Sequence, residues 1–576
     1  MEDQTTPTRV RASADVVAAF RRASADENPL HVDAGYARRT AFGEPVVYGV
    51  LGALLALAGL EPRPDRAPAR VRARFQAPVL ARQECSRDVV EDTPGRAVVR
   101  LRDGERVLLE VTVDFRTGPG AAPVPVPPDA GEGRAPRTEA RDAAPADLVP
   151  GLPVGAGYAP RWAALRELTG TLDLTGRGLG PVEAGVLCWI SYLVGMEAPG
   201  RAALLSELDV AFEAPASSET SSAEAPEAPE APECAGESAG ETATPDGAAT
   251  DRPGAAGPFV TRATVTELDE RFRLLRLEGT AEAPGLRARA RVRAFHREDA
   301  PATDVARLAA LLPEGRPLAG RTALVVGASR GLGAAVTQAL ALQGARVYAG
   351  FHRSADDMTA VAAALGEDAA SRIHPLRGDA ADAEWCAAAV DRIHAESGRL
   401  DLLVLNACPA PTRMPLAPDA SARAADHLAR AVALAREPLA ACAARVAADG
   451  GRVLAVSSAW AADPQPGWSA YVTAKSAVEG LVRAAAAEFP EASWTLARPP
   501  RLRTAMTATP LSTGPTAPVE PVAAALARAA AEPAAPGRTE VLEFAEDGTP
   551  ATDGAAEPPA ARPDGAGLGG APAAGA

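Results

Sequence analysis

Short apolar runs alternate with longer amphipathic segments between residues 319 and 547. Runs of this length bounded by turn residues predict buried strands, and the segments between them repeat at helical spacing. Strands and helices in strict alternation predict a parallel sheet with helices on both faces, the doubly wound α/β (Rossmann) class. The predicted strands are 323–326, 345–351, 373–377, 402–405, 452–456 and 493–497; the predicted helices are 334–342, 355–365, 382–397, 420–448 and 470–489.

The first 300 residues follow a second pattern, a long apolar segment and then several strands. The apolar segment 45–60 predicts a buried core helix, and an amphipathic helix is predicted at 14–23. A helix followed by antiparallel strands predicts an α+β layer in which a sheet wraps around the helix. The predicted strands are 70–77, 86–91, 97–102 and 106–116, the last with Val107, Leu109, Val111, Val113 and Phe115 on one face.

This helix-and-strand pattern occurs twice. Gly185-Val186-Leu187 repeats Gly49-Val50-Leu51, and Phe212-x-Ala214-Pro215 repeats Phe75-x-Ala77-Pro78, at an offset of 136 that rises to 137. Strand patterns at 259–267, 271–281 and 286–295 complete the second copy. A repeat of this length predicts two structurally equivalent units.

Stretches rich in Gly, Pro and Ala, without helical or strand periodicity, separate these blocks and predict linkers. The predicted organisation is a first α+β domain at 1–116, a linker at 117–147, a second copy at 148–300 with an insertion at 216–257, a connector at 301–318, the α/β domain at 319–547 and a tail at 548–576.

Composition narrows the class of protein. The net charge of −15 over 576 residues argues against a nucleic-acid partner. The N-terminus lacks a signal-peptide pattern, and 45–60 is too short to span a membrane, so no membrane association is expected. The six cysteines contain no C-x-x-C pair, which predicts a reduced, cytoplasmic protein without a structural metal. They stand at positions 85, 188, 234, 386, 408 and 442.

A carboxylate and an imidazole stand five residues apart around a proline-bent turn. In the segment Ser24-Ala-Asp-Glu-Asn-Pro-Leu-His-Val-Asp33, Asp26 and His31 can converge on one small volume. Such a pair suits proton transfer beside a thioester carbonyl, or the activation of a water. A helix-capping aspartate beside a surface histidine is the structural alternative.

With Phe42-Gly43-x-Pro45-Val46-Val47-Tyr48-Gly49-Val50-Leu51, this segment resembles the MaoC-like hydratase/dehydratase family over most of residues 10–115. The resemblance implies a hot-dog fold that acts on (R)-3-hydroxyacyl and trans-2-enoyl thioesters. It implies Asp26 and His31 as the catalytic pair and the Gly49 N–H as the group that polarises the thioester oxygen. One departure is that the helix after Gly49 carries no Ser or Thr through Leu60.

The second copy has no equivalent pair, because no histidine occurs between His31 and His296. We therefore expect a double hot dog with one active site. In this interpretation the second copy is a structural mate and a wall of the acyl tunnel.

Glycines follow the first predicted strand of the α/β domain in the order Gly327-x-x-x-Gly331-x-Gly333, directly before a helix. A glycine turn into a helix N-terminus is a phosphate cradle, although a tight turn alone would look similar. Downstream lie Val456-Ser457-Ser458 at a strand end and Tyr471-x3-Lys475 on a helix. An ammonium one helical turn from a phenol would lower the pKa of the tyrosine, so that it exchanges a proton near neutral pH.

Together these motifs resemble the short-chain dehydrogenase/reductase family over nearly all of 319–545. The resemblance implies that Ser458 holds a substrate carbonyl, that Tyr471 transfers its proton and that Lys475 also grips the nicotinamide ribose. Basic residues after the second strand suit a 2′-phosphate, so NADPH is expected, with no metal. The implied cofactor-binding residues are Gly327, Ser329, Arg330, Gly331, Leu332, Gly333, His352, Arg353, Asp379, Asn406, Tyr471, Lys475 and Thr504.

The α/β domain departs from the short-chain dehydrogenase/reductase pattern at three positions. Leu405 and Cys408 replace the first Asn and the Gly of the Asn-Asn-Ala-Gly motif, and Ala433 aligns with an Asn of the proton relay. Loss of that Asn would slow proton resupply rather than change the reaction type.

A reductase that makes a 3-hydroxyacyl thioester and a dehydratase that removes its water catalyse consecutive steps. The leading hypothesis is a bifunctional 3-oxoacyl-thioester reductase and (R)-3-hydroxyacyl dehydratase of fatty-acyl or polyketide synthesis, acting on CoA or acyl-carrier thioesters. Two alternatives stay open: hydratase and dehydrogenase in the oxidative direction, and a reductase with a non-catalytic hot-dog module. Acyl length, carrier and association through the reductase domain also stay open.

Overall fold

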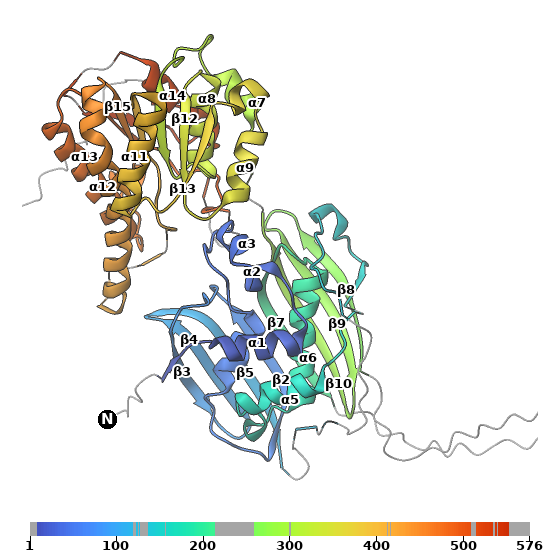
Figure 1. The fold of residues 1–576 in the computed structure, drawn as a ribbon. Helices are drawn as coiled ribbons and strands as arrows, with labels where there is room; N and C mark the ends of the chain where they lie inside the picture. The colour runs from blue at the N-terminus through green and yellow to red at the C-terminus, as the bar shows by residue number, and fades with distance from the viewer. Residues whose placement is uncertain are drawn as a thin grey trace, which may run out of the picture. The chain divides into compact units, whose positions relative to one another are not determined.

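The computed structural model divides the chain into two compact units, residues 1–299 and, apart from 508–512, residues 300–576 (Figure 1). The described residues are 8–118, 123–124, 126, 136–155, 157–213, 259–298, 301–411, 413–414, 416, 418–508, 514–533, 536–537 and 539–551. The predicted insertion at 216–257 and nearly all of the predicted tail lie outside them.

The N-terminal unit is built on one ten-stranded sheet in the order β1-β3-β4-β5-β2-β7-β10-β9-β8-β6. The two sequence copies meet where β2 pairs antiparallel with β7. Arg70 pairs with Ala211 and Arg74 with Glu207, so the offset of 137 maps one pair onto the other. The strands are β1 (Thr8–Val10), β2 (Arg66–Phe75), β3 (Cys85–Asp92), β4 (Arg96–Asp103), β5 (Arg106–Thr117), β6 (Pro153–Val154), β7 (Ala203–Glu213), β8 (Val260–Asp269), β9 (Leu274–Ala283) and β10 (Leu286–His296).

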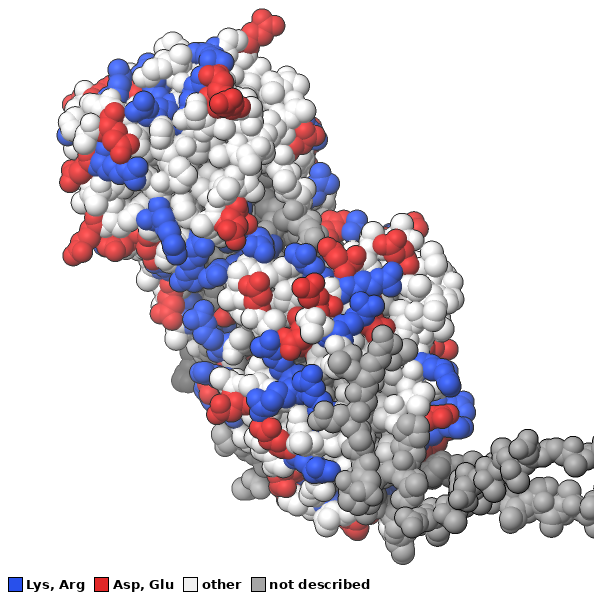
Figure 2. Space-filling model, turned by 45° about the vertical axis from the view of Figure 1, so that its right-hand side comes forward, with Lys and Arg blue, Asp and Glu red and all other residues white. Residues whose placement is uncertain are grey.

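Each copy places an apolar helix against this sheet. In α4 (Gly49–Leu57) and α6 (Pro181–Tyr192) nearly every residue is buried, as expected for helices that are hydrophobic on all sides. The outward strand positions carry arginines that alternate with acidic residues on the neighbouring strands, such as Arg70 with Asp209. Figure 2 shows this interspersed blue and red surface on the N-terminal unit. The remaining helices of the unit are α1 (Ala14–Ser24), α2 (Pro29–Val32), α3 (Ala34–Arg38) and α5 (Trp162–Thr171), with short turns η1 (Pro145–Asp147), η2 (Thr175–Arg177) and η3 (Leu193–Glu197).

The chain is ordered further into the predicted 117–147 linker than expected. Residues 136–147 are described, Ala143 is buried in the core, and the Arg141 N–H donates to the Met196 carbonyl. Part of the predicted linker, residues 136–147, therefore packs against the second copy although its composition is that of a linker.

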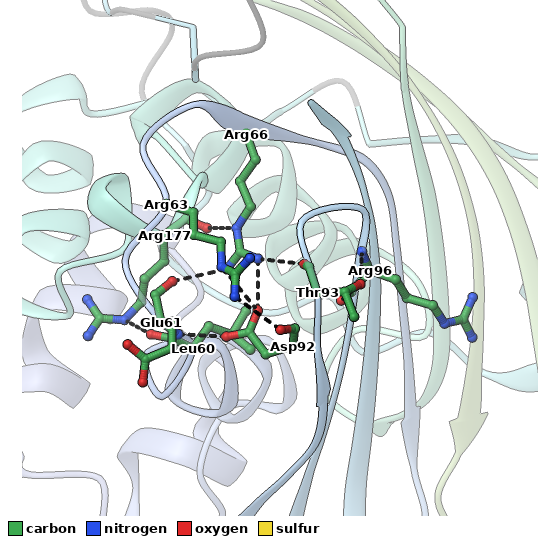
Figure 3. A network of polar contacts seen from close by, with 8 residues as sticks. All are labelled: Leu60, Glu61, Arg63, Arg66, Asp92, Thr93, Arg96 and Arg177. Carbon is green, nitrogen blue, oxygen red and sulfur yellow. Dashed lines mark hydrogen bonds and ion pairs between the residues drawn. The ribbon is translucent and has the colours of Figure 1, made fainter. Parts of the chain in front are cut away.

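A buried arginine joins the two copies at one end of the sheet (Figure 3). Arg66 is only 1% exposed; its guanidinium donates to an Asp92 carboxylate oxygen (2.9 Å) and to the Arg177 carbonyl (3.3 Å) of the second copy. It also stacks 4.1 Å from the Phe115 ring. Arg177 in turn donates to the Leu60 carbonyl at 2.7 Å.

Replacing Arg66 by methionine is expected to lower the free energy of unfolding by about 3 kcal/mol, because the Asp92 carboxylate loses its ion-pair partner at 2.9 Å and keeps the longer contact with Arg63, at 4.0 Å. Thermal unfolding of the full chain, with the N-terminal unit followed by hydrogen exchange, measures the loss. Arg74→Met is the matched control. Arg74 pairs with Glu207 with its own side chain 71% exposed, so this change should cost less than about 1 kcal/mol. Equal losses in the two variants would contradict the prediction.

The C-terminal unit contains a seven-stranded parallel sheet in the order β13-β12-β11-β14-β15-β16-β17. The predicted Rossmann alternation is confirmed, and β17 and α14, which were not predicted, extend it. Its strands are β11 (Thr322–Val326), β12 (Arg346–Phe351), β13 (Ile373–Arg377), β14 (Leu402–Leu405), β15 (Arg452–Val456), β16 (Ser493–Arg498) and β17 (Thr539–Glu543).

Two apolar clusters fill the space between this sheet and its helices, one on each face. The helices α7 (Val305–Leu311), α8 (Gly331–Leu342), α9 (Ala355–Ala363), α10 (Glu367–Ala370) and α14 (Val519–Ala531) contribute to the first cluster or adjoin it. The helices α11 (Ala383–Ser397), α12 (Ser421–Ala448) and α13 (Ser469–Glu488) contribute to the second, and the turns are η4 (Pro418–Ala420) and η5 (Ala459–Ala461). Within the described ranges, no helix has the length and hydropathy needed to cross a bilayer.

Candidate active sites

Asp26 lies in a buried turn immediately after α1. Helix α1 ends at Ala25, whose left-handed backbone (φ 52°) redirects the chain toward the second copy. The carboxylate of Asp26 is 1% exposed and accepts the Asn28 N–H (3.0 Å) and the Ser191 hydroxyl (2.8 Å). The Asn28 amide donates to the carbonyls of Gly195 (3.0 Å) and Gly200 (2.8 Å), so side chain and backbone both fasten this turn to the second copy.

His31 is held in one orientation by α2 and the strand-like segment after it. The ring Nδ1 lies 2.7 Å from the Val46 carbonyl, which can only accept, so Nδ1 carries the proton. Burial lowers the pKa of His31 to about 4 and keeps the ring neutral. The Nε2 lone pair of His31 is therefore left to accept a proton.

Asp26 and His31 line one cavity of about 60 Å³. Tyr48 connects them: its ring centroid lies 4.1 Å from that of His31, and its hydroxyl donates to the Asp26 carbonyl at 3.0 Å. Gly49 follows as the first residue of α4, where the N–H groups have no partner within the helix. Apolar side chains form much of the remaining wall, from both copies: Leu30, Val46, Val47, Phe75, Val79, Leu109, Val194, Leu204, Leu205 and Phe295.

The pKa values of Asp26 and His31 are shifted in opposite directions by burial. Burial raises the pKa of Asp26 to about 7, while the bonds from Ser191 and Asn28 act against this rise. Near neutral pH the cavity thus holds a neutral imidazole base and a carboxyl group that is substantially protonated. Pairs pushed apart in this way are suited to act as base and acid in one reaction.

Sequence reasoning missed Ser191, which lies on α6 of the second copy. The first copy offers no hydroxyl on its own helix after Gly49, and that absence was the available signal that the mate supplies one. The mate also approaches closely at Gly195, where an added Cβ would lie 2.4–2.6 Å from the Asp26 carboxylate. The second copy therefore does more than close the wall of the cavity, because it touches the ionisable group itself.

For the dehydration that the MaoC-like resemblance implies, Ser191→Ala is expected to move the basic limb of the pH profile upward by about half to one pH unit. The serine bond favours the charged carboxylate, so its loss raises the Asp26 pKa and extends the range in which Asp26 is protonated. Initial rates of dehydration between pH 5 and 9 measure the shift. Ser191→Thr keeps the hydroxyl and is the control, and an unmoved limb in the alanine variant would contradict the assignment.

The glycine motif of the second unit forms a tight turn between β11 and α8. Gly327 has φ 85° and Gly331 has φ 55°, conformations that glycine adopts without strain. A Cβ on Gly333 would lie 2.0 Å from the Gly327 carbonyl oxygen, and the Asn406 amide donates to that oxygen at 3.0 Å. The glycines therefore let the backbone N–H groups at the α8 N-terminus be approached closely, and a phosphate group fits such a cradle.

The remaining cofactor-side residues border this turn. Thr504 lies against Gly331, where an added Cβ would come within 3.2 Å of the threonine side chain. His352 and Arg353 follow β12, and the His352 ring nitrogen lies 4.0 Å from the Asp379 carboxylate. Sequence reasoning missed Arg430 of α12, which donates to both Asp379 oxygens at 2.7 and 2.8 Å. Ser329, Arg330 and Leu332 occupy the turn and the first residues of α8.

Ser458, Tyr471 and Lys475 come together at the carboxyl end of β15. The Ser458 hydroxyl lowers the pKa of the Tyr471 phenol, and the Lys475 ammonium donates to the Val456 carbonyl at 3.0 Å. Lys475 is the single lysine of the chain, whose other basic side chains apart from histidine are all arginine. A compact ammonium at this buried position cannot be exchanged for the larger planar guanidinium without moving its neighbours.

The predicted lowering of the Tyr471 pKa is wrong in its net direction. Burial raises the pKa of Tyr471 and outweighs the opposing effects of Lys475 and Ser458. The pKa of Lys475 is lowered by burial but raised on balance by its neighbours Cys408 and Tyr471. The site therefore holds a protonated phenol beside an ammonium.

Two side chains around Lys475 depart from expectation. Cys408, the residue in place of the motif glycine, raises the pKa of the Lys475 ammonium. His427 of α12 is 9% exposed and its Nε2 has no partner among the described residues. Burial and the Lys475 charge lower the pKa of His427, so a neutral imidazole stands on the helix from which the relay Asn is missing.

The two sites match two known families. Residues 2–104 match the MaoC-like domain and residues 321–512 match the short chain dehydrogenase family. The first copy is thus of the hot-dog type and the second unit is a Rossmann-type dehydrogenase/reductase domain; the two matches cover Asp26, His31 and Gly49 and the motifs from Gly327 to Thr504.

Curated relatives resemble the second unit. The cis-4-hydroxycyclohexanecarboxylate dehydrogenase of Sinomonas cyclohexanicum is 37% identical over 183 residues, 30% of this chain and 70% of that protein. The D-threitol dehydrogenase of Mycolicibacterium smegmatis is 43% identical over 90 residues, 16% of this chain and 34% of that protein. The 1-cyclohexenylcarbonyl-CoA reductase of Streptomyces collinus is 29% identical over 174 residues, 29% of this chain and 59% of that protein.

Among solved structures, a short chain dehydrogenase from Burkholderia cenocepacia in complex with NADP is similar with a TM-score of 0.35 and 26% identity. The similarity covers 39% of this chain and 98% of that one.

Proposed function

Since this chain belongs to the short-chain dehydrogenase family through its second unit and carries a MaoC-like domain in its first, we propose that it is a bifunctional enzyme. The reductase unit converts a 3-oxoacyl thioester into the (R)-3-hydroxyacyl thioester, and the MaoC-like unit dehydrates that product to the trans-2-enoyl thioester. The observation that carries the proposal is the cavity that holds a neutral His31 and a protonatable Asp26 together.

Dehydration follows from the protonation states of this pair. The His31 Nε2 removes the proton next to the thioester carbonyl, and the Asp26 carboxyl gives its proton to the 3-hydroxyl group, which leaves as water. The Gly49 N–H stabilises the negative charge that develops on the thioester oxygen. The two copies form a double hot dog, in which the second copy positions Asp26 through Ser191.

Reduction uses the second site. A bound nicotinamide nucleotide supplies the hydride, with its phosphates at the glycine turn. Ser458 holds the substrate carbonyl, Tyr471 donates its proton to the carbonyl oxygen, and Lys475 stabilises the phenolate that remains. A phenol that burial keeps protonated is the acid that reduction needs, whereas oxidation would need the phenolate. This supports Tyr471 as the proton donor of the reduction, and the preference for NADPH favours the reductive, biosynthetic direction.

The preference for NADPH rests on the basic residues after β12. Arg353→Ala is expected to lower kcat/KM for NADPH about tenfold to a hundredfold, because charge-assisted bonds to the 2′-phosphate are lost, and to leave NADH nearly unchanged. Steady-state kinetics with both cofactors measure the change. Arg346→Ala, an exposed arginine at the opposite end of the same strand, is the control. Equal losses with NADH and NADPH would contradict the assignment.

Mass spectrometry of products tests the whole proposal. The purified chain is incubated with NADPH and a 3-oxoacyl thioester, on CoA and on an acyl carrier protein in parallel. The expected products are the 3-hydroxyacyl and then the 2-enoyl thioester. If the 3-oxoacyl thioester is reduced but not dehydrated, the first unit is a non-catalytic binding module. If the chain only converts the enoyl thioester to the 3-oxoacyl thioester, with NAD, it works in the oxidative direction.

A further inference from the structure

Three aromatic rings meet at the reductase site. The Trp460 and Trp468 ring centroids lie 5.4 Å apart, and those of Trp460 and Tyr471 lie 6.1 Å apart at an interplanar angle of 88°. Trp468 and Tyr471 are 6.4 Å apart at 76°. These are favourable distances and angles for aromatic pairs. In a chain with 4% aromatic residues and six tryptophans, two indoles around one catalytic phenol call for a specific role.

Both indoles are placed by the residues that position the catalytic groups. Trp460 lies in η5, and its backbone N–H donates to the Ser458 hydroxyl at 3.2 Å. Trp468 is the residue before α13 and lies three residues before Tyr471. Its backbone forms an isolated β-bridge with Met414, in the chain after β14. Both rings therefore border the Tyr471 phenol, and Trp460 is also tied to Ser458.

The indoles are only half-buried, unlike Trp494, which is 1% exposed in the core of the same unit. Their remaining faces are apolar surface next to the reacting groups. A half-buried aromatic surface gains most from a flat or cyclic apolar group, which covers two ring faces while losing little conformational freedom.

We propose that Trp460 and Trp468 form a ring-binding wall, and that the reductase selects 3-oxoacyl thioesters with an aryl or alicyclic group next to the reacting carbonyl. This inference rests on the proposed function of the same site and adds the substrate class. A linear acyl chain would cover one indole at most and leave the other in water.

Paired kinetics test it. The full chain is assayed with NADPH on the CoA thioesters of 3-oxo-3-phenylpropanoate and 3-oxobutanoate. We expect kcat/KM to favour the phenyl substrate by about tenfold to a hundredfold, the gain from covering a ring-sized apolar surface. Trp468→Leu and Trp460→Leu should each lower this ratio several-fold, mainly through the phenyl substrate. The rate with 3-oxobutanoyl-CoA shows in each variant that the unit is folded and active.

Trp385→Leu is the matched control, because this half-buried indole lies on α11 and donates to the Arg377 carbonyl (3.0 Å) rather than bordering Tyr471. Its ratio should equal that of the unaltered chain. A ratio at or below one in the unaltered chain, or ratios unchanged in both Trp460 and Trp468 variants, overturns the ring-binding wall. No reduction of either thioester would instead overturn the proposed function.

Discussion

Asp26→Asn is expected to lower the dehydration rate by a factor of about a thousand or more, and to leave reduction of the 3-oxoacyl thioester unchanged. The amide occupies the same volume but cannot give a proton to the departing hydroxyl group. Dehydration is measured with (R)-3-hydroxybutanoyl-CoA by the absorbance of the enoyl product, and reduction by the consumption of NADPH.

Asp33→Asn is the control in the same turn, since Asp33 caps α3 through the Gly35 and Tyr36 N–H groups and does not line the cavity. This variant should keep full dehydratase activity. An Asp26 variant with more than a tenth of the original rate would remove Asp26 from the chemistry, whatever its effect on reduction.

Asp26→Asn should also make the protein more stable above neutral pH. The folded-state pKa of Asp26 is raised to about 7 from an ordinary value near 4, so folding binds a proton, and stability is lost as pH rises through this interval. Asparagine removes that loss. A higher melting temperature of Asp26→Asn at pH 8 than at pH 5, relative to the unaltered chain at each pH, would show the cost of keeping a carboxyl group buried for catalysis.

Tyr471→Phe is expected to lower reduction by a factor of about a thousand or more while dehydration and NADPH binding persist. Phenylalanine keeps the contacts with Trp460 and Trp468 but has no hydroxyl to protonate the carbonyl oxygen. Single-turnover oxidation of NADPH measures the chemical step, and fluorescence titration measures cofactor binding.

Tyr348→Phe is its control, because Tyr348 lies in the core of the same unit and bonds Glu396 and Ser397 away from the site. Reduction in that variant should stay near the original rate. A Tyr471 variant that still reduces the thioester at a substantial rate would mean that a different group, with His427 as the nearest candidate on α12, supplies the proton.

Most of the α/β unit was predictable because most of its strands are short apolar runs that a helix follows, and the strand and helix periodicities are both local. The strand β17 was missed because its residues are largely exposed. The helix at 420–448 and the strand at 452–456 were predicted within a residue of α12 and β15. The motif residues of both sites were predictable for the same reason, because Gly327, Tyr471 and Lys475 belong to short segments with fixed internal spacing.

Contacts between segments far apart in the chain were not predictable. Ser191 reaches Asp26 across 165 residues, and Arg430 reaches Asp379 across 51. The net pKa of Tyr471 was mispredicted because the neighbouring Lys475 is visible in the sequence whereas the degree of burial is not. The ordered segment 136–147 was missed because its composition is that of a linker.

The Arg66 cluster of Figure 3 has a consequence for how the two copies diverged. The offset of 137 places Arg66 at the position of Ala203 in the second copy, and Ala203 lines the active cavity. Likewise Arg177 contacts the end of α4 much as Asn28 contacts the residues after α6. The position that borders an open cavity in the second copy, Ala203, is occupied in the first copy by the buried guanidinium of Arg66. A second active site at this end of the sheet would therefore require a smaller residue at position 66 before any acid or base is added.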